Sequence, residues 1–466
     1  MTMHASLTQR LAALIQGITD EVVTPLAIAQ ARMCIVDAVG VALAGSAEQP
    51  SQILLKTPGV ATAPGRSLVF GTQLRTSALD ATLLNGTSAH ALDFDDFSSI
   101  MGGHHTVPVM PALFALAEEH GLSGKQVLHA YIAGVEVEIR MARALGFHHY
   151  DKGWHPTATI GTFGAAAAAA HLLRLDVEQT ATALGIAASM AAGLKSNFGT
   201  MVKPFHAGQC GRNGLLAVLM TQQGFESSEQ ALEHHQGFLN VFNGAGNFDV
   251  DKLFAHWADP LEIEHETIAL KQFPCCGSTH PAITVMLQLV REEGIGAADV
   301  AAIEVMPHRR RLRHTDNAVP NTPLEAKFSV QYAVVRALLD GSVRMRDFEG
   351  SAFKTPAVRE LLRITQARPN PDMSDEAEEQ WGAEVIVTTR DGRRLSRRVE
   401  QLVGRGGASP MSDAEMWDKF EDCATLVMPT AQARAAYEQL NRLESLRDFR
   451  QLAPLLQGET RQVEHA

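Results

Sequence analysis

The chain has 466 residues, of which 45% are hydrophobic and 20% charged, which is typical of a globular protein with two or three domains and excludes a disordered or collagen-like chain. Its 40 basic and 52 acidic residues give a formal charge of −12, which disfavours nucleic acid as a partner. Five cysteines without regular spacing predict no disulfide framework and favour a reducing, cytoplasmic location.

The N-terminal segment predicts a surface helix and no targeting sequence. Leu7, Leu11 and Leu14 are spaced at three or four residues, and Arg10 lies within that pattern. The most lipid-like stretch, Ile160–Leu173, is rich in alanine and shorter than the about 20 strongly apolar residues that a membrane-spanning helix needs. We therefore expect a soluble protein without a membrane partner.

From residue 6 to about residue 270, apolar residues recur with the period of helices, and glycine or proline separates the runs. Six consecutive alanines at 165–170 favour a core helix, because small side chains let neighbouring helices approach closely. The predicted helices are Pro25–Leu43, Ser77–His90, Val107–His120, Gly124–Ala144, Gly161–Leu173, Val177–Ala192 and Gly211–Gln223.

Residues 271–401 combine helices with strands, and the chain is helical again after them. An Asp-Gly pair at 391–392 between two alternating runs predicts a β-hairpin. We therefore predict a mostly α protein, with a large discontinuous all-helical domain (1–270 with 402–466) and a smaller α+β domain (271–401). The predicted elements are helices Thr279–Arg291 and Ala326–Asp340, strands Val300–Met306, Glu384–Thr389 and Arg393–Val399, and helices Asp413–Cys423 and Thr430–Leu443.

The sequence lacks the glycine motifs that bind dinucleotides or nucleotide phosphates, and it lacks an H-E-x-x-H pair, paired C-x-x-C motifs and G-x-S-x-G. We therefore expect no organic cofactor, and any chemistry should depend on side chains alone. The densest polar cluster places three carboxylates and three histidines within sixteen positions: His90, Asp93, Asp95, Asp96, His104 and His105.

This cluster has three possible roles. It could perform acid–base chemistry, bind a divalent cation such as Mg²⁺, or form a solvated loop that caps the following helix. Spacing does not decide between them, because Asp93 and Asp96 share a helical face whereas Asp93 and Asp95 share a strand face.

Three further segments carry side chains that could bind a ligand or take part in chemistry. His155 precedes a predicted helix and either joins the chemistry or satisfies a buried carbonyl. Lys203 precedes Pro204, which predicts an extended segment, and it either binds a ligand or is solvated. Cys275 and Cys276 are adjacent, so one is expected to pack in the core while the other stands near a helix start, where the dipole lowers a thiol pKa; the alternative is that both pack.

Taken in chain order, these motifs resemble the MmgE/PrpD family over about residues 5–450. Together they are specific for this family, which includes 2-methylcitrate dehydratase, cis-aconitate decarboxylase and iminodisuccinate epimerase. The resemblance is carried by NGTSAHALDFDD at 85–96, His104 with VMPALFALAEE at 109–119, WHP at 154–156 with GTFGAA at 161–166, VKPFHAG at 202–208, KQFP at 271–274 and AKFS at 326–329.

The resemblance implies a homodimer, a small lid domain beside the helical domain, and a site in the cleft between the two domains. It implies action on small di- and tricarboxylates without an organic cofactor and without a metal. The dehydratase and decarboxylase branches carry a threonine after the DFDD run and a histidine after K-x-F-P, where this chain has Phe97 and Cys276. The site residues that it implies are Asp93, His104, His155, Lys203 and Lys271.

The chemistry of these residue types agrees with the resemblance. A C–H next to a carboxylate is a weak acid, so its removal needs an aligned base and cations that stabilise the developing charge. His104 and His155 can give or take a proton near neutral pH. Lys203 and Lys271 are suited to bind the substrate carboxylates and fix their geometry.

The expected activity is that of a hydro-lyase, which removes this proton from a hydroxy di- or tricarboxylate and eliminates water. One alternative is an epimerase of an amino- or imino-dicarboxylate, with the thiol of Cys276 as the second base. A further alternative is a decarboxylase of the cis-aconitate type. The alternative to an enzyme is a non-catalytic helical scaffold that binds a partner.

Overall fold

The computed structural model describes residues 5–373, 382–401, 403–406 and 409–458. The chain divides into two compact units, residues 1–270 with 416–466 (unit 1) and residues 271–415 (unit 2). The predicted fold class, mostly α with strands concentrated in the smaller part, is confirmed. Residues 403–406 and 409–415, which the sequence analysis assigned to the helical domain, group with unit 2; residue 402 lies outside the described residues.

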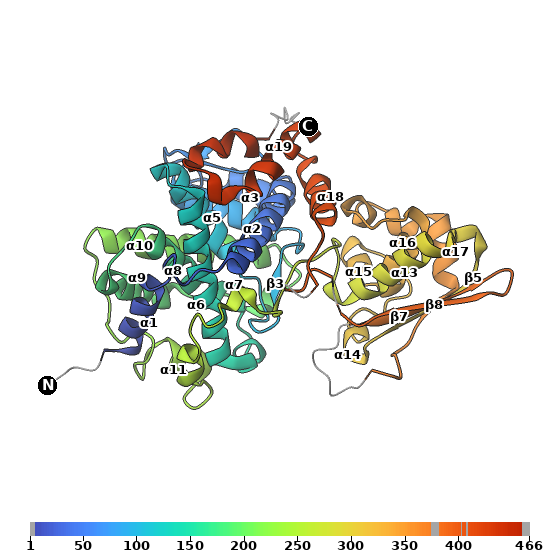
Figure 1. Ribbon diagram of the computed structural model, residues 1–466, viewed down its shortest axis with the longest axis horizontal. Helices are drawn as coiled ribbons and strands as arrows, with labels where there is room; N and C mark the ends of the chain where they lie inside the picture. The colour runs from blue at the N-terminus through green and yellow to red at the C-terminus, as the bar shows by residue number, and fades with distance from the viewer. Residues whose placement is uncertain (1–4, 374–381, 402, 407–408, 459–466) are drawn as a thin grey trace. The chain divides into compact units, whose positions relative to one another are not determined.

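Unit 1 is built from helices and two short antiparallel ribbons, β1–β2 and β3–β4 (Figure 1). Its elements are α1 (Leu7–Gln16), α2 (Pro25–Gly45), α3 (Gln49–Lys56), β1 (Ser67–Leu68), β2 (Arg75–Thr76), α4 (Ala78–His90), β3 (Phe97–Ser98), α5 (Thr106–His120), α6 (Gly124–Asp151), α7 (Pro156–Thr159), α8 (Gly161–Leu172), α9 (Val177–Met190), α10 (Val202–Gln222), α11 (Phe238–Asn243), α12 (Val250–Phe254), β4 (Ile268–Ala269), most of α18 (Asp413–Ala424) and α19 (Thr430–Leu440).

The centre of unit 1 is formed by α4, α5, α6, α8 and α10, which pack on one another. The six alanines of α8 are all buried, as a core helix requires. Helices α4 and α10 approach so closely that a Cβ on Gly86 would lie 2.7 Å from the Cα of Gly208. This contact matters for the site, because the end of α4 carries His90 and the start of α10 carries Lys203.

Helix α2 is long and apolar enough to cross a membrane by length and composition. In the structure, 72% of its most apolar window is buried inside the protein, and Val36, Val39 and Leu43 are fully enclosed. Apolar helices at the centre of a large core show the same composition. Its hydropathy is therefore accounted for by packing within unit 1.

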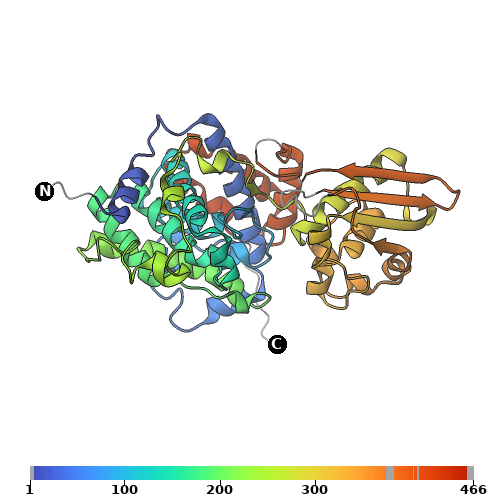
Figure 2. The same cartoon turned by 90° about the horizontal axis from the view of Figure 1, so that it is seen from below.

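The C-terminal segment returns to the N-terminal part of unit 1. In Figures 1 and 2 the red helices α18 and α19 lie beside the blue helix α2. Lys419 of α18 forms a buried ion pair with Asp37 of α2, and its Nζ donates a hydrogen bond to the carbonyl oxygen of Phe94 at 2.9 Å. Lys419 thus ties the loop after α4 to two helices.

Unit 2 contains a four-stranded sheet in the order β6-β5-β7-β8, in which β5 and β6 are parallel and the other pairs antiparallel. Helices α13, α16 and α17 pack on this sheet. Its elements are α13 (His280–Glu293), β5 (Val300–Pro307), α14 (Arg309–Leu312), α15 (Pro323–Lys327), α16 (Val330–Asp340), α17 (Pro356–Arg363), β6 (Thr365–Ala367), β7 (Ala383–Thr389) and β8 (Arg394–Val399).

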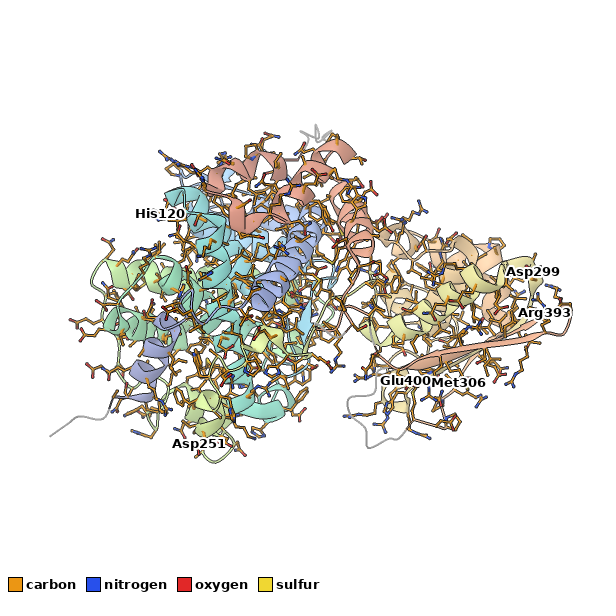
Figure 3. The ribbon with its side chains drawn as sticks, in the orientation of Figure 1. His120, Asp251, Asp299, Met306, Arg393 and Glu400 are labelled. Atoms are coloured by element: carbon orange, nitrogen blue, oxygen red, sulfur yellow. The ribbon has the colours of Figure 1, made fainter. Side chains whose placement is uncertain are left out.

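The predicted hairpin is present as β7 and β8, and Gly392 has the positive φ of 89° that its turn requires. Since β5 and β8 both pair antiparallel to β7, they run in the same direction. Figure 3 shows the consequence: Asp299 and Arg393, which precede the two strands, lie at one end of the sheet, and Met306 and Glu400 lie at the other.

Several predicted helices differ from the structure in their bounds; for example, α6 extends to Asp151 although the prediction ended at Ala144. The helix expected at Ala326–Asp340 is broken into α15 and α16, because Ser329 is an N-cap whose side chain accepts the N–H of Tyr332. The helix expected at Gly211–Gln223 begins nine residues earlier, at Val202. Helix α17 and strand β6 are among the elements that the sequence patterns did not predict.

Candidate active site

The DFDD run forms the loop between α4 and β3. Asp93 has a φ of 53°, a left-handed conformation that aspartate tolerates better than most residues. After this turn Phe94, Asp95 and Asp96 are buried, whereas the side chain of Asp93 keeps 42% of its surface exposed. The loop therefore presents one accessible carboxylate and buries the other two.

Asp95 lies between two imidazoles. Its Oδ2 is 2.9 Å from His90 Nδ1 and 2.8 Å from His104 Nδ1, and its side chain is fully buried. Burial opposes its ionisation, but the charges and hydrogen bonds of His104 and His90 outweigh burial and hold the pKa of the Asp95 carboxyl well below its usual value. Asp95 is therefore a buried carboxylate that orients two histidines.

The surroundings of His104 determine its tautomer. Its Nδ1 faces the Asp95 carboxylate and also the carbonyl oxygen of Asp96 at 2.7 Å, so this nitrogen carries the proton. Its Nε2, the ring nitrogen that does not face Asp95, lies 3.4 Å from Asp93 Oδ1. The backbone N–H of His104 donates to Thr157 Oγ1 at 2.9 Å, which positions the backbone of this residue. A carboxylate behind an imidazole in this way is the arrangement of a general base.

Lys203 completes this group. Its Nζ lies 2.9 Å from Asp93 Oδ1, so Asp93 is shared between Lys203 and His104. The expectation that Lys203 lies in an extended segment is wrong, since it occupies the first turn of α10. Pro204 is compatible with that turn because the first N–H groups of a helix have no intrahelical partner.

His155 precedes α7 and is almost completely buried. Its ring lies 6.0 Å from that of His90, and its Nδ1 is 3.1 Å from the Nδ1 of His206. Burial lowers the pKa of His155 well below its usual value, and the charges of His90 and Lys203 act in the same direction. His155 is therefore neutral, and its side chain bonds another imidazole instead of the buried carbonyl that was its alternative role.

The part of the loop beyond Asp95 is held by a second buried group. Thr106 Oγ1 donates to Asp96 Oδ2 at 2.5 Å and contacts the hydroxyl of Tyr131 at the same distance. Burial raises the pKa of Asp96 to about 7, and the charge of Asp95 adds to the rise. These contacts, with those of Lys419, make the DFDD loop a rigid support for Asp93 and Asp95.

A metal ion has two possible sites in the described part of unit 1. Within each group, the ligand atoms lie within 4.8 Å of one another. The first group is His90, Asp93, Asp95 and His104, and the second is Cys34, Asp96 and His105. In the first group, the ammonium of Lys203 already supplies positive charge at Asp93, and both Nδ1 atoms face Asp95. These contacts favour proton transfer over metal binding.

The two remaining predicted residues belong to unit 2. Lys271 is buried, and Cys276 is half-buried with its N–H donating to the carbonyl oxygen of Lys327 at 2.9 Å. Cys275 is buried in the core of unit 2, and burial raises its pKa to about 12; Cys275 is therefore a packing residue. Of the two thiols, only Cys276 is partly exposed; a 3-10 turn at 277–279 separates it from α13.

The surroundings of Cys276 are cationic. Burial lowers the pKa of Arg311 to about 10, the charges of Arg310 and Arg405 add to the lowering, and Cys276 acts in the opposite direction. Nearby positive charge favours a thiolate over a thiol.

The structure thus brings Asp93, His104, His155 and Lys203 together in unit 1, and it adds His90, Asp95 and His206, which the sequence analysis did not assign to the site.

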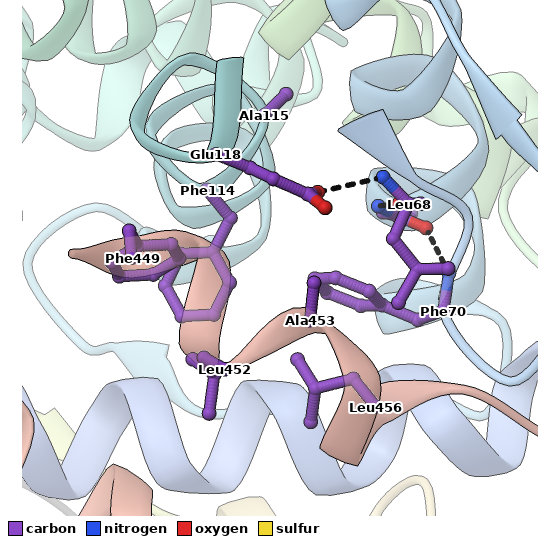
Figure 4. A pocket seen from close by; sticks show the side chains of 10 residues that line it. Leu68, Phe70, Phe114, Ala115, Glu118, Phe449, Leu452, Ala453 and Leu456 are labelled. Carbon is purple, nitrogen blue, oxygen red and sulfur yellow. Dashed lines mark hydrogen bonds between the residues drawn. The ribbon is translucent and has the colours of Figure 1, made fainter. Parts of the chain in front are cut away.

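A small pocket elsewhere in unit 1 shares no residue with this group (Figure 4). Phe70, Phe114 and Phe449 dominate its lining. The carboxylate of Glu118 accepts the N–H of Leu68 at 2.8 Å, and Asn85 is bonded to the same strand. Since its polar groups are already engaged in holding the backbone, this pocket offers no chemistry.

Two family models match the chain: the MmgE/PrpD N-terminal domain matches residues 9–251, and the MmgE/PrpD C-terminal domain matches residues 273–444. The chain belongs to the MmgE/PrpD family. The family predicted from the motifs is thereby confirmed.

MmgE/PrpD relatives with an assigned activity match the chain over nearly its whole length. Cis-aconitate decarboxylase of Mus musculus is 27% identical over 99% of this chain and 96% of its own length. The Homo sapiens enzyme is 27% identical (98% and 95%), and that of Aspergillus terreus is 26% identical (94% and 93%). These relatives are lyases, so the MmgE/PrpD protein described here belongs to a family of enzymes that includes lyases.

Replacing Lys203 by alanine should damage turnover more than folding. Loss of a charge-assisted contact costs roughly 1.5–3 kcal/mol, so kcat/KM should fall about tenfold or more. The melting temperature should change little, because the Lys203–Asp93 pair is partly exposed. Lys195→Ala is the matched control, since Lys195 is also a half-buried lysine of unit 1 but donates to the Tyr150 carbonyl oxygen. An unchanged rate with a lowered melting temperature would show that Lys203 is structural.

Proposed function

We propose that this protein is a cytoplasmic lyase that acts on a small hydroxy di- or tricarboxylate, removing the proton next to a carboxylate and eliminating water without an organic cofactor. The observation that carries the proposal is the Asp95–His104 pair, in which a buried carboxylate fixes the proton on Nδ1 and leaves Nε2 as the base. We also propose that it acts as a homodimer.

In the proposed reaction, each group has a separate task. His104 Nε2 takes the proton from the substrate carbon, and Asp95 stabilises the imidazolium that forms. Lys203 exchanges Asp93 for a substrate carboxylate and stabilises the negative charge that develops when the C–H bond breaks. The departing hydroxyl group needs a proton, which neutral His155 can supply from its ring N–H as its other nitrogen accepts one.

Decarboxylation is the second candidate, and the similarity to cis-aconitate decarboxylases favours it. In that reaction the C–C bond to a carboxylate breaks, CO₂ leaves, and a histidine that has taken a proton from solvent gives it to the resulting carbanion. The same residues could serve both reactions, because each develops negative charge on a substrate carbon that a cation can stabilise. Epimerisation is the third candidate, which the half-buried Cys276 and its cationic neighbours favour as a second base.

Proton NMR in D₂O separates the three reactions. Citrate-like, aconitate-like and amino-dicarboxylate compounds would be incubated with protein that has been treated with EDTA. Loss of water with a new C=C bond is the expected result. Loss of CO₂ would identify a decarboxylase, and deuterium uptake without net change would identify an epimerase. No reaction with any compound, or a reaction that needs added Mg²⁺, would contradict the proposal.

Replacing Cys276 by serine tests the role of the thiol. If Cys276 exchanges a proton with the substrate, turnover should fall about tenfold or more, since an alcohol is a far weaker acid near neutral pH. Cys275→Ser is the control: it should cost roughly 1–3 kcal/mol of stability, because it buries a hydroxyl, and leave the rate unchanged. Equal kcat values for Cys276→Ser and the unmodified protein would exclude Cys276 from the chemistry and remove the case for an epimerase.

A further inference from the structure

His206 lies one helical turn after Lys203 on α10, and no prediction assigned it a role. Its Nδ1 is 3.1 Å from the Nδ1 of His155, which precedes α7, and the centroids of the two rings are 5.3 Å apart. His155 is 1% exposed, whereas His206 is half-buried. The two rings therefore connect the interior of the site to a more exposed position.

A contact between two imidazole nitrogens has strict requirements. It is a hydrogen bond only if one nitrogen carries a proton and the other is bare. Burial lowers the pKa of both His155 and His206, so both rings are neutral near pH 7. One ring must then be the Nδ1–H tautomer with a bare Nε2, and the other must be the Nε2–H tautomer.

We propose that His155 and His206 form a proton relay for the reaction assigned to this site. A proton that arrives at the bare Nε2 of one ring is followed by transfer of the shared proton between the two Nδ1 atoms, and a proton leaves from the Nε2 of the other ring. The charge of the pair is unchanged at the end, and only the two tautomers have exchanged. The relay thus carries a proton between buried His155 and the more exposed His206. This inference rests on the proposed function.

The surroundings of His155 make the relay useful. Its ring lies near His90, and the edge of Phe198 packs against it with centroids 4.8 Å apart. Because His155 is enclosed by these neighbours, it needs a partner through which to regain or release a proton after each turnover. In this arrangement His206 acts through His155 and is a positioning residue.

The competing explanation is that the contact only packs α7 against α10. Substitution by asparagine separates the two explanations, because its amide can occupy the place of Nδ1 and bond His155 but cannot pass a proton on. His206→Asn therefore keeps the contact and removes the relay, whereas His206→Ala removes both. His171→Asn is the control, since His171 is another half-buried histidine of unit 1, whose Nε2 bonds the Ile18 carbonyl oxygen at 2.8 Å.

The first measurement is the tautomeric state of the histidines, read from ¹⁵N NMR of the full chain labelled at histidine. The relay predicts that His155 and His206 have opposite tautomers, and that His206→Asn changes the signals of His155 while leaving those of His171 unchanged. The same tautomer for both rings, with Nε2 protonated, would overturn the relay. This measurement needs no substrate, so it decides about the pair even if the proposed reaction is wrong.

The second measurement uses the substrate found by NMR. His206→Asn should lower kcat about tenfold or more, because a lost proton-transfer partner slows the step it serves, while KM stays within about twofold. His171→Asn should keep the rate of the unmodified protein. A purely structural contact predicts the reverse order: a normal kcat for His206→Asn and a loss of melting temperature only for His206→Ala. That outcome would overturn the relay.

Discussion

Replacing His104 by asparagine should lower kcat by about 10²–10⁴-fold, the usual contribution of a general base. Asparagine can still donate a hydrogen bond to Asp95 from the position of Nδ1, so the buried carboxylate keeps a partner. What the variant loses is Nε2, the nitrogen that faces Asp93. The melting temperature should therefore change much less than the rate, which thermal denaturation checks.

The control for this variant is His129→Asn. His129 is also a histidine of unit 1 whose Nδ1 faces an aspartate, Asp20, at 3.4 Å. It takes no part in the group around Asp95. The account predicts normal turnover for His129→Asn, and a His104→Asn protein with the same kcat as this control would rule out His104 as the base.

Replacing Asp95 by asparagine should also lower kcat strongly, by about 10²–10⁴-fold, because the amide removes the charge that stabilises the imidazolium and disturbs the tautomer of His104. The same change should reduce the free energy of unfolding by roughly 1–3 kcal/mol, since two imidazole N–H groups share this carboxylate. Steady-state kinetics and urea denaturation measure the two effects.

Asp80→Asn is the matched control for Asp95→Asn. Asp80 is a buried aspartate of α4, and Arg212 lies 4.0 Å from its carboxylate, at the limit of an ion pair. The control should keep full turnover. If Asp95→Asn retained the rate of this control while losing stability, Asp95 would be a structural residue and the dyad would have no part in the reaction.

Much of the fold followed from patterns along the chain. The helical period, the run of alanines and the Asp-Gly turn each depend on neighbouring residues, and the elements they predicted are present as α2, α4–α6, α8, α9, α13 and the β7–β8 hairpin. The start of α10 was missed because proline after Lys203 is a signal both for an extended segment and for the first turn of a helix. Only the tertiary contacts with α4 distinguish the two.

The site was predicted in composition but not in arrangement. The spacing of Asp93, Asp95 and Asp96 left open which of them is buried, because it suits a helix and a strand equally. The answer depends on the left-handed backbone of Asp93, which turns Asp95 inward to His90. A resemblance between motifs also gives no distances, so Asp95 remained unassigned although it lies within the quoted run.

Local sequence patterns could not predict the contact between His155 and His206, since 51 residues separate the two positions along the chain. It depends on how α7 and α10 pack in unit 1. The sequence did contain one signal, because His206 stands three residues after Lys203, and residues at that spacing lie on one face of a helix. That signal was lost with the prediction that Lys203 is not helical.

The most direct test of the central claim is the rate of C–H bond cleavage at the carbon next to the substrate carboxylate. This rate is followed as the entry of deuterium from D₂O at that carbon or as the loss of its proton. It should be measured by NMR in unmodified protein and in His104→Asn under identical conditions. The account predicts exchange or loss of that proton in the unmodified protein and a rate at least about 100-fold lower in the variant, with both proteins folded. Equal rates in the two folded proteins would contradict the assignment of proton abstraction to the Asp95–His104 pair.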